Sequence, residues 1–200
     1  MRPIDIEIID NFVSPSYLEE LQYAVNPNTT QWFFQGKQSL KLRDNNIPND
    51  IEDFGFVIPF VDIGQPNIFY DNKLSTFIRP LAYQIKDYAE ALNIIRCRLD
   101  LTVLHKQKYI HPPHVDVQNL ESDFGSAIIY LNDTDGDTII YDKKRDKNLS
   151  DHQSYPTNMK IKKTIAPKPG RLVLFNGDYV HTGHSPSEHQ TRILLNIVLS

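Results

Sequence analysis

The sequence predicts an α+β protein that is mainly β, with a helix-rich N-terminal half packed on a C-terminal antiparallel sandwich or barrel. Two observations carry this prediction. Apolar side chains recur at three- and four-residue steps over residues 74–92, which is a helical pattern. After Asn93, short alternating or apolar runs are separated by Gly, Pro, Asn and Asp, as is typical of antiparallel strands.

The N-terminal elements begin with isoleucines that alternate with charged residues over residues 4–8, which predicts a half-buried strand. A short helix is expected over residues 17–25, and short strands and loops over residues 32–65. The helix at 74–92 has Ser75 or Asn72 as its expected N-cap. Its Pro80 must lie in the first turns or kink the helix, because an interior proline loses a backbone hydrogen bond.

The C-terminal half is expected to contain six strands, at residues 98–104, 126–131, 138–141, 171–175, 179–182 and 192–199. Nothing between the two halves resembles a linker. Residues 1–200 are therefore interpreted as a single domain, in which residues 1–95 support a β-core at residues 96–200.

Composition indicates an ordinary globular protein of 200 residues with a formal net charge of -4, which disfavours nucleic acid as a partner. The one cysteine, Cys97, excludes an internal disulfide and is expected in the core, in a protein from a reducing compartment. No signal peptide or membrane-spanning run is recognisable, so a cytoplasmic protein without a membrane partner is expected.

A polar stretch at residues 142–163 has seven basic and three acidic residues, a local charge of +4. The simpler interpretation is a solvated surface loop. The alternative is a lid or substrate-docking loop beside an active site.

A candidate metal site begins with His114-Val115-Asp116. Residues two apart on a strand point to the same side, so the imidazole and the carboxylate would converge. A third nitrogen ligand from another strand would complete a two-histidine, one-carboxylate triad, which is typical of non-haem Fe(II) oxygenases. The tripeptide alone is weak evidence for a metal site, because His-x-Asp often occurs by chance. Taken alone, it favours the simpler interpretation of a surface turn after the diproline 112–113, with Asp116 solvated.

The segment downstream strengthens this hypothesis. A strand at 171–175 is followed by a turn and then by His181, which can reach the ligands of a neighbouring strand. Arg192 opens an aliphatic strand that contains no acidic residue, and a buried guanidinium needs an anion. A dicarboxylate cofactor would supply that anion, whereas an Arg192 at the exposed strand end would pair with Glu188 or another surface acid.

The ordered blocks HPPHVD, AIIYLNDTDGDTIIYD, PKPGRLVLFNGDYVHTGHSP and TRILLNIVL lie within residues 99–199. Together they resemble the iron(II) and 2-oxoglutarate-dependent dioxygenases of the prolyl 4-hydroxylase-like branch. The resemblance implies a double-stranded β-helix (jelly roll) core with buttressing N-terminal helices.

The resemblance also implies that His114, Asp116 and His181 bind the iron. Two other histidines are alternatives. His184 lies three positions after His181, but the match of His181-x-Gly183 to the His-x-Gly of the family favours His181. His111 is separated from the ligands by the diproline and is interpreted as a residue of the pocket rim.

For the cofactor, Arg192 matches the basic residue that pairs with the distal carboxylate of 2-oxoglutarate. Tyr130 matches a tyrosine that contacts the same carboxylate in some members. His105 stands where the family often has a cofactor-contacting tyrosine, and residues 136–138, Gly-Asp-Thr, stand in place of a Gly-Gly-Glu-Thr turn.

The implied activity is hydroxylation of a C–H bond with Fe(II), 2-oxoglutarate and dioxygen, with ascorbate as an accessory reductant. The implied substrate is a protein or peptide, such as one with a prolyl residue. The main alternative is a non-catalytic jelly-roll module that binds a metal or ligand. A structural protein with incidental histidines is a third interpretation, and it predicts no specific metal uptake.

Overall fold

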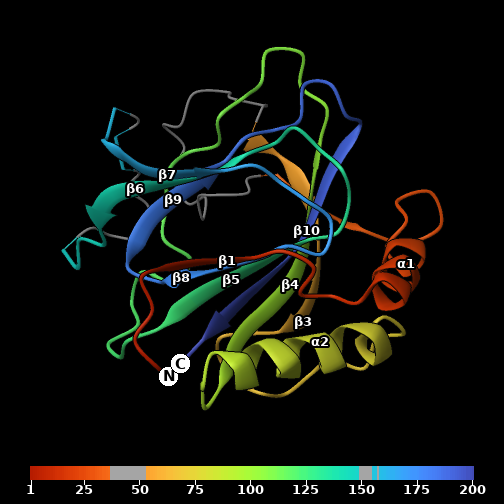
Figure 1. Ribbon diagram of the computed structural model, residues 1–200, viewed down its shortest axis with the longest axis horizontal. Coiled ribbons are helices and arrows are strands. Elements are labelled where there is room, and N and C mark those ends of the chain that lie inside the picture. Colours follow the sequence, from red (N-terminus) through yellow and green to blue (C-terminus); the bar gives the residue numbers. More distant parts are fainter. Residues whose placement is uncertain (37–52, 149–154, 157) are drawn as a thin grey trace.

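The computed structural model describes residues 1–36, 53–148, 155, 156 and 158–200. A larger and a smaller antiparallel sheet face each other, and two helices cover the outer face of the larger sheet (Figure 1). The two ends of the chain lie close together beside the second helix (Figure 1). This arrangement confirms the mainly β jelly roll with buttressing helices.

The larger sheet has seven strands, in the order β1 (Ile6–Ile9), β8 (Leu172–Asn176), β5 (Gly125–Tyr130), β10 (Thr191–Leu199), β4 (Ile94–Val103), β3 (Gly55–Val61), β2 (Phe33–Gln35). Strands from the N-terminal half therefore extend both edges of the C-terminal core. Residues 1–95 supply these edge strands as well as helices, and the expected boundary at residue 95 falls inside β4.

The smaller sheet has the order β7 (Ile161–Ile165), β6 (Thr138–Lys144), β9 (Tyr179–Gly183). The prediction of a loop over residues 142–163 is wrong at both ends, because β6 extends to Lys144 and β7 begins at Ile161. The first four residues of β7 are exposed and include Lys162 and Lys163, so their pattern is that of a charged edge strand. Residues 149–154 and 157 of this stretch lie outside the described residues.

The two helices are α1 (Pro15–Ala24) and α2 (Ser75–Tyr88). Neither expected N-cap of α2 is correct, because Leu74 occupies the N-cap position and no side chain caps the helix. Asn72 forms a turn just before the helix, in which its Oδ1 accepts a 2.9 Å hydrogen bond from the Leu74 N–H. Ser75 is instead the first helical residue. Pro80 lies inside the helix, in its second turn. No helix of the described ranges is long and apolar enough to cross a membrane.

Alternation along β4 separates the core from the site. Cys97, Leu99 and Leu101 face the helices and belong to the main hydrophobic core. Burial raises the pKa of the Cys97 thiol, which fits the predicted core role. The residues between them face the smaller sheet, and they are polar or charged: Arg96, Arg98, Asp100 and Thr102. The inner face of the larger sheet is thus the place for a polar site.

Candidate active site

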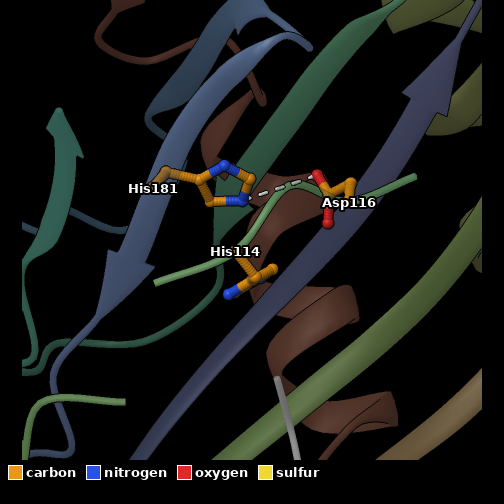
Figure 2. Close-up of side chains that lie close together, drawn as sticks. All are labelled: His114, Asp116 and His181. Atoms are coloured by element: carbon orange, nitrogen blue, oxygen red, sulfur yellow. Dashed lines mark ion pairs between the residues drawn. The ribbon is translucent and has the colours of Figure 1, made fainter. Parts of the chain in front are cut away.

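Three side chains converge between the two sheets: His114, Asp116 and His181 (Figure 2). One donor atom of each lies within 4.8 Å of the others, and the Nε2 of His181 is 3.7 Å from a carboxylate oxygen of Asp116. The side chains of Asp116 and His181 are almost fully buried. The structure thus brings together the three residues that the sequence identified as candidate ligands.

The backbone explains why the two histidines meet. His114 and His181 form an antiparallel bridge, in which each backbone N–H donates to the carbonyl of the other residue at 2.9 Å. Directly opposed residues point to the same side, so their rings lie only 4.7 Å apart between centroids. Residues 114–116 do not form the strand that the same-side argument assumed, because His114 makes only this single bridge in a loop. The bridge instead brings His181 to His114.

Hydrogen bonds to the backbone fix which ring nitrogens are available. The Nδ1–H of His114 donates to the Pro112 carbonyl at 3.1 Å, and that of His181 donates to the Tyr179 carbonyl at 3.0 Å. In the neutral form of each ring, the Nε2 atom then carries the free electron pair and can bind a metal. Burial, and secondarily the neighbouring His181, lowers the pKa of His114 to about 4, so the ring is neutral at pH 7.

Three residues hold the Asp116 carboxylate in place. Arg96 forms an ion pair with its Oδ1, the Ser126 hydroxyl donates to its Oδ2 at 2.6 Å, and the Asn196 amide approaches both oxygens at 3.4–3.5 Å. Burial alone would raise the pKa of Asp116, but the charge of Arg96, helped by the hydrogen bond from Ser126, lowers it well below its usual range. The carboxylate is therefore ionised and oriented, as a metal ligand must be.

These supporting residues were not identified from the sequence. The available signal was a polar residue at an inward position of an otherwise apolar strand, as with Ser126 in β5 and Asn196 in β10.

The alternative ligands lie apart from the triad. His184 is not grouped with the three candidate ligands, and neither of its buried ring nitrogens has a hydrogen-bond partner among the described residues. His111 is buried rather than at a rim. Its Nδ1 lies 2.8 Å from the Asp53 carboxylate, and its Nε2 lies 3.0 Å from the Ser185 hydroxyl.

A cavity of about 540 Å³, counting the part open to solvent, contains the triad at one end. The cavity floor is made by β4 and β10, where register places Arg98 opposite Asn196, Asp100 opposite Leu194, and Thr102 opposite Arg192.

Arg192 lies in the same cavity and is only 7% exposed. Its Nε donates to the Gly136 carbonyl at 2.7 Å, and its Nη2 donates to the Thr138 hydroxyl at 2.8 Å. Among the residues that the structure describes, no carboxylate lies within ion-pair distance of it, so the alternative pairing with Glu188 is not formed. A buried, unpaired guanidinium is costly unless an anion joins it.

Two glycines let Arg192 occupy this position. A Cβ on Gly136 would lie 2.5 Å from the Arg192 Cδ, and one on Gly183 would lie 3.2 Å from its terminal nitrogens. The turn at residues 136–138 therefore encloses the guanidinium, which gives a physical reason for a glycine there.

The remaining two candidate cofactor contacts lie differently. Tyr130 is fully buried behind Arg192, with the guanidinium 5.7 Å from its ring centroid and its hydroxyl donating to Thr138 at 2.6 Å. His105 is not among the described residues that line the cavity, and its ring packs against Tyr109. Contacts of either residue with the cofactor stay predictions.

Thr102 is a cavity residue that the sequence did not identify. It is directly opposite Arg192 and 5% exposed, and its hydroxyl has no hydrogen-bond partner among the described residues. A hydroxyl so placed can donate to a carboxylate bound by Arg192. Neutral imidazoles, an ionised carboxylate and an unpaired buried guanidinium in one cavity thus fit Fe(II) and a dicarboxylate.

Residues 101–199 match the family described as the 2OG-Fe(II) oxygenase superfamily. A comparison with curated proteins finds no match.

Many solved structures share the fold, and three of them illustrate the range of proteins that do. An oxidoreductase of the 2OG-Fe(II) oxygenase family from Burkholderia pseudomallei is 13% identical, with a TM-score of 0.64 over 98% of this chain and 84% of that chain. The epimerase SnoN, solved with Fe3+, alpha ketoglutarate and nogalamycin RO, is 12% identical, with a TM-score of 0.64 over 98% and 78%. A prolyl hydroxylase from Trichoplax adhaerens, solved with a hypoxia inducible factor peptide fragment, is 14% identical, with a TM-score of 0.61 over 97% and 82%.

Proposed function

Because the chain belongs to the 2OG-Fe(II) oxygenase superfamily, we propose that it hydroxylates a C–H bond of its substrate, with Fe(II) bound by His114, Asp116 and His181. We further propose that Arg192 binds the distal carboxylate of 2-oxoglutarate. Family membership makes the protein an oxidoreductase that uses iron, 2-oxoglutarate and dioxygen, whereas the hydroxylation and the residue roles are proposals.

The observation that carries this proposal is the state of Arg192. A guanidinium with no carboxylate partner among the described residues lies buried in the cavity that holds the candidate ligands. Arginine binds a carboxylate through two parallel hydrogen bonds, and an anion at this point would offset the cost of burying the charge. A protein that bound a metal alone would have no use for this arrangement.

When bound, iron and 2-oxoglutarate supply the oxidation: 2-oxoglutarate loses CO2 to become succinate, one dioxygen atom enters succinate, and the other enters the substrate C–H bond. The residues of the chain bind and orient the metal, 2-oxoglutarate and the substrate, and they exclude water from the site. Their hydrogen bonds present the Nε2 atoms of His114 and His181, while Arg96, Ser126 and Asn196 hold the third ligand. Arg192 and Thr102 would orient the far end of 2-oxoglutarate.

A peptidyl prolyl residue is the first substrate to test, because one structural neighbour is a prolyl hydroxylase solved with a peptide. Other neighbours are an epimerase and a carbocyclase from nogalamycin biosynthesis, so substrates in this fold also include small molecules.

The test is to incubate the protein with Fe(II), 2-oxoglutarate, ascorbate and dioxygen, and to measure succinate with and without candidate peptides. Metal binding and 2-oxoglutarate binding are measured on the same samples, with Mn(II) in place of iron. Arg192→Gln should weaken 2-oxoglutarate binding at least about tenfold and leave Mn(II) binding unchanged. Arg79→Gln, on the exposed side of α2, is the matched control and should change neither.

A protein that binds Mn(II) but not 2-oxoglutarate, and forms no succinate, would support the non-catalytic binding module instead. Equal 2-oxoglutarate affinity in Arg192→Gln and the unmodified protein would contradict the role of Arg192.

A further inference from the structure

The cavity contains a second guanidinium, that of Arg98. Neither the proposed iron site nor the proposed 2-oxoglutarate site includes it. It extends from β4 into the cavity, and its side chain is 21% exposed. Its Nε lies 3.0–3.2 Å from both oxygens of Asp100. Neither of its terminal nitrogens, Nη1 or Nη2, donates a hydrogen bond to any residue in the described ranges.

Register places Arg98 beside the path between the metal site and Arg192. On β10, Asn196 approaches Asp116, Leu194 follows, and Arg192 ends the row. Arg98 is directly opposite Asn196 on the neighbouring strand, with its side chain on the same inner face. It is therefore near the metal end of the cavity, where a C–H bond must lie to be oxidised.

The wall on the other side of this path is apolar and closed. Ile128 on β5 is the other register partner of Asn196, and it packs in a cluster with Ile140, Val173 and Phe175 that joins the two sheets. That cluster includes residues of β5, β8 and β10 but no described residue of β4. On β4, the Arg98 side chain is partly exposed, so a substrate that approaches the metal along this side would meet Arg98.

The free hydrogen-bond donors of Arg98 indicate which chemical group of a substrate it would bind. Asp100 is 8% exposed and accepts from the Nε of the guanidinium, and no other acid among the described residues is paired with Arg98. The two terminal nitrogens are therefore available to a further anion. Two parallel N–H donors on a planar group match the two oxygens of a carboxylate. Arg192 and the metal already account for the two ends of 2-oxoglutarate.

We infer that the substrate of this enzyme carries a free carboxylate, and that Arg98 binds it while Asp100 positions the guanidinium. This inference rests on the proposed function and narrows it to small carboxylate-bearing molecules, free amino acids included. A prolyl residue inside a peptide has no such group, so a capped prolyl peptide would be a poor substrate.

The test compares free amino acids and short aliphatic monocarboxylates with their primary amides, for example L-proline with L-prolinamide. Binding is measured by calorimetry, without dioxygen, on protein loaded with Mn(II) and 2-oxoglutarate, so the readout does not depend on turnover. Affinity for 2-oxoglutarate is measured first on each sample. Succinate formation with Fe(II) is then measured for each compound that binds.

At least one acid should bind, and its amide should bind at least about tenfold more weakly, because it lacks the charge and one acceptor oxygen. Arg98→Gln should reduce the affinity for the acid to that for the amide and leave 2-oxoglutarate affinity within about twofold. Arg98→Lys, which keeps the charge but not the fork, should be intermediate. Arg79→Gln is again the control for a lost surface charge.

Amides that bind as well as acids would overturn the inference, and so would an Arg98→Gln protein with unchanged affinity for the acid. If Arg98→Gln lowers the affinity for 2-oxoglutarate as strongly as Arg192→Gln does, Arg98 binds 2-oxoglutarate rather than the substrate, and the inference is wrong. Protein that binds 2-oxoglutarate but none of the acids would contradict this inference alone. Protein that does not bind 2-oxoglutarate would contradict the proposed function as well.

Discussion

His114 links the candidate metal site to the pH dependence of folding. Its pKa is about 4 in the folded protein, below the ordinary value of 6.5, because the ring is buried beside His181. The unfolded chain therefore takes up a proton at His114 at a higher pH than the folded protein does. Between about pH 6.5 and pH 4, the free energy of unfolding of metal-free protein should fall by up to about 3 kcal/mol from this residue.

Urea denaturation across this pH range checks that prediction, with His114→Gln as the comparison. The variant has no group to titrate at this position, so its free energy of unfolding should decrease less toward pH 4. Parallel pH profiles for the two proteins would show that His114 is not buried in its neutral form.

Gly136 gives a second prediction about a single residue. A methyl group there would overlap the Arg192 Cδ at 2.5 Å and the His184 carbonyl oxygen at 2.6 Å, so Gly136→Ala must displace the guanidinium. Calorimetry should show 2-oxoglutarate binding weakened about tenfold and Mn(II) binding unchanged. Gly64→Ala is the matched control, because nothing lies within 4 Å of the added carbon. Equal 2-oxoglutarate affinity in both variants would contradict the role of the turn.

The structure brings His114, Asp116 and His181 together, as the sequence predicted. That prediction needed the family resemblance as well as chemistry, because the spacing of His114 and Asp116 alone is weak evidence and the His-x-Gly match selected His181 over His184. Thr102 was not identified from the sequence, because its place opposite Arg192 depends on the register of β4 against β10, which local spacing does not reveal. The cofactor contact of His105 stays a prediction.

Among the larger elements, the loop between β4 and β5 carries both His114 and Asp116 without being a strand. His111 connects this loop to Asp53 just before β3 and to Ser185 just after β9. All three side chains are buried, so these bonds are shielded from water. His111 should therefore act as a positioning residue for the two ligands that follow it.

His111→Ala should lower Mn(II) affinity about tenfold and lower the melting temperature. The loop would lose its bonds to Asp53 and Ser185, and the buried carboxylate of Asp53 would lose this partner. His111→Asn, which keeps a hydrogen-bonding group, should recover part of the affinity. His189→Ala, at an exposed histidine, is the control. If His111→Ala melts earlier but binds Mn(II) normally, His111 has a structural role only.

Helices and strands could be predicted from the sequence where they bury one face, because burial produces a periodic apolar pattern. The helix α2 was predicted because it buries one continuous face, with Ile78, Leu81 and Ile85 in the core. The strand β7 was missed because four of its five residues are exposed, so it has no apolar alternation to detect. Its pairing with β6 depends on backbone hydrogen bonds, which leave no trace in side-chain pattern.

For the whole molecule, the seven-stranded sheet predicts a single cooperative unit. β1 pairs with β8 at one edge, β3 pairs with β4 toward the other, and the core beneath the sheet includes residues of both helices. We predict one unfolding transition, with coincident curves from far-ultraviolet circular dichroism and tyrosine fluorescence. Residues 96–200 expressed alone should not fold, because they would lack part of β4 and the helices that cover the core. Two separate transitions, or a folded C-terminal fragment, would contradict the single domain.

The most direct test of the central claim is anomalous diffraction from crystals grown with Mn(II) and 2-oxoglutarate in the absence of dioxygen. We expect one strong peak bonded to the Nε2 of His114, the carboxylate of Asp116 and the Nε2 of His181, with a 2-oxoglutarate carboxylate on Arg192. A peak bonded to His184 or His111 in place of these three, or 2-oxoglutarate bound away from Arg192, would contradict it.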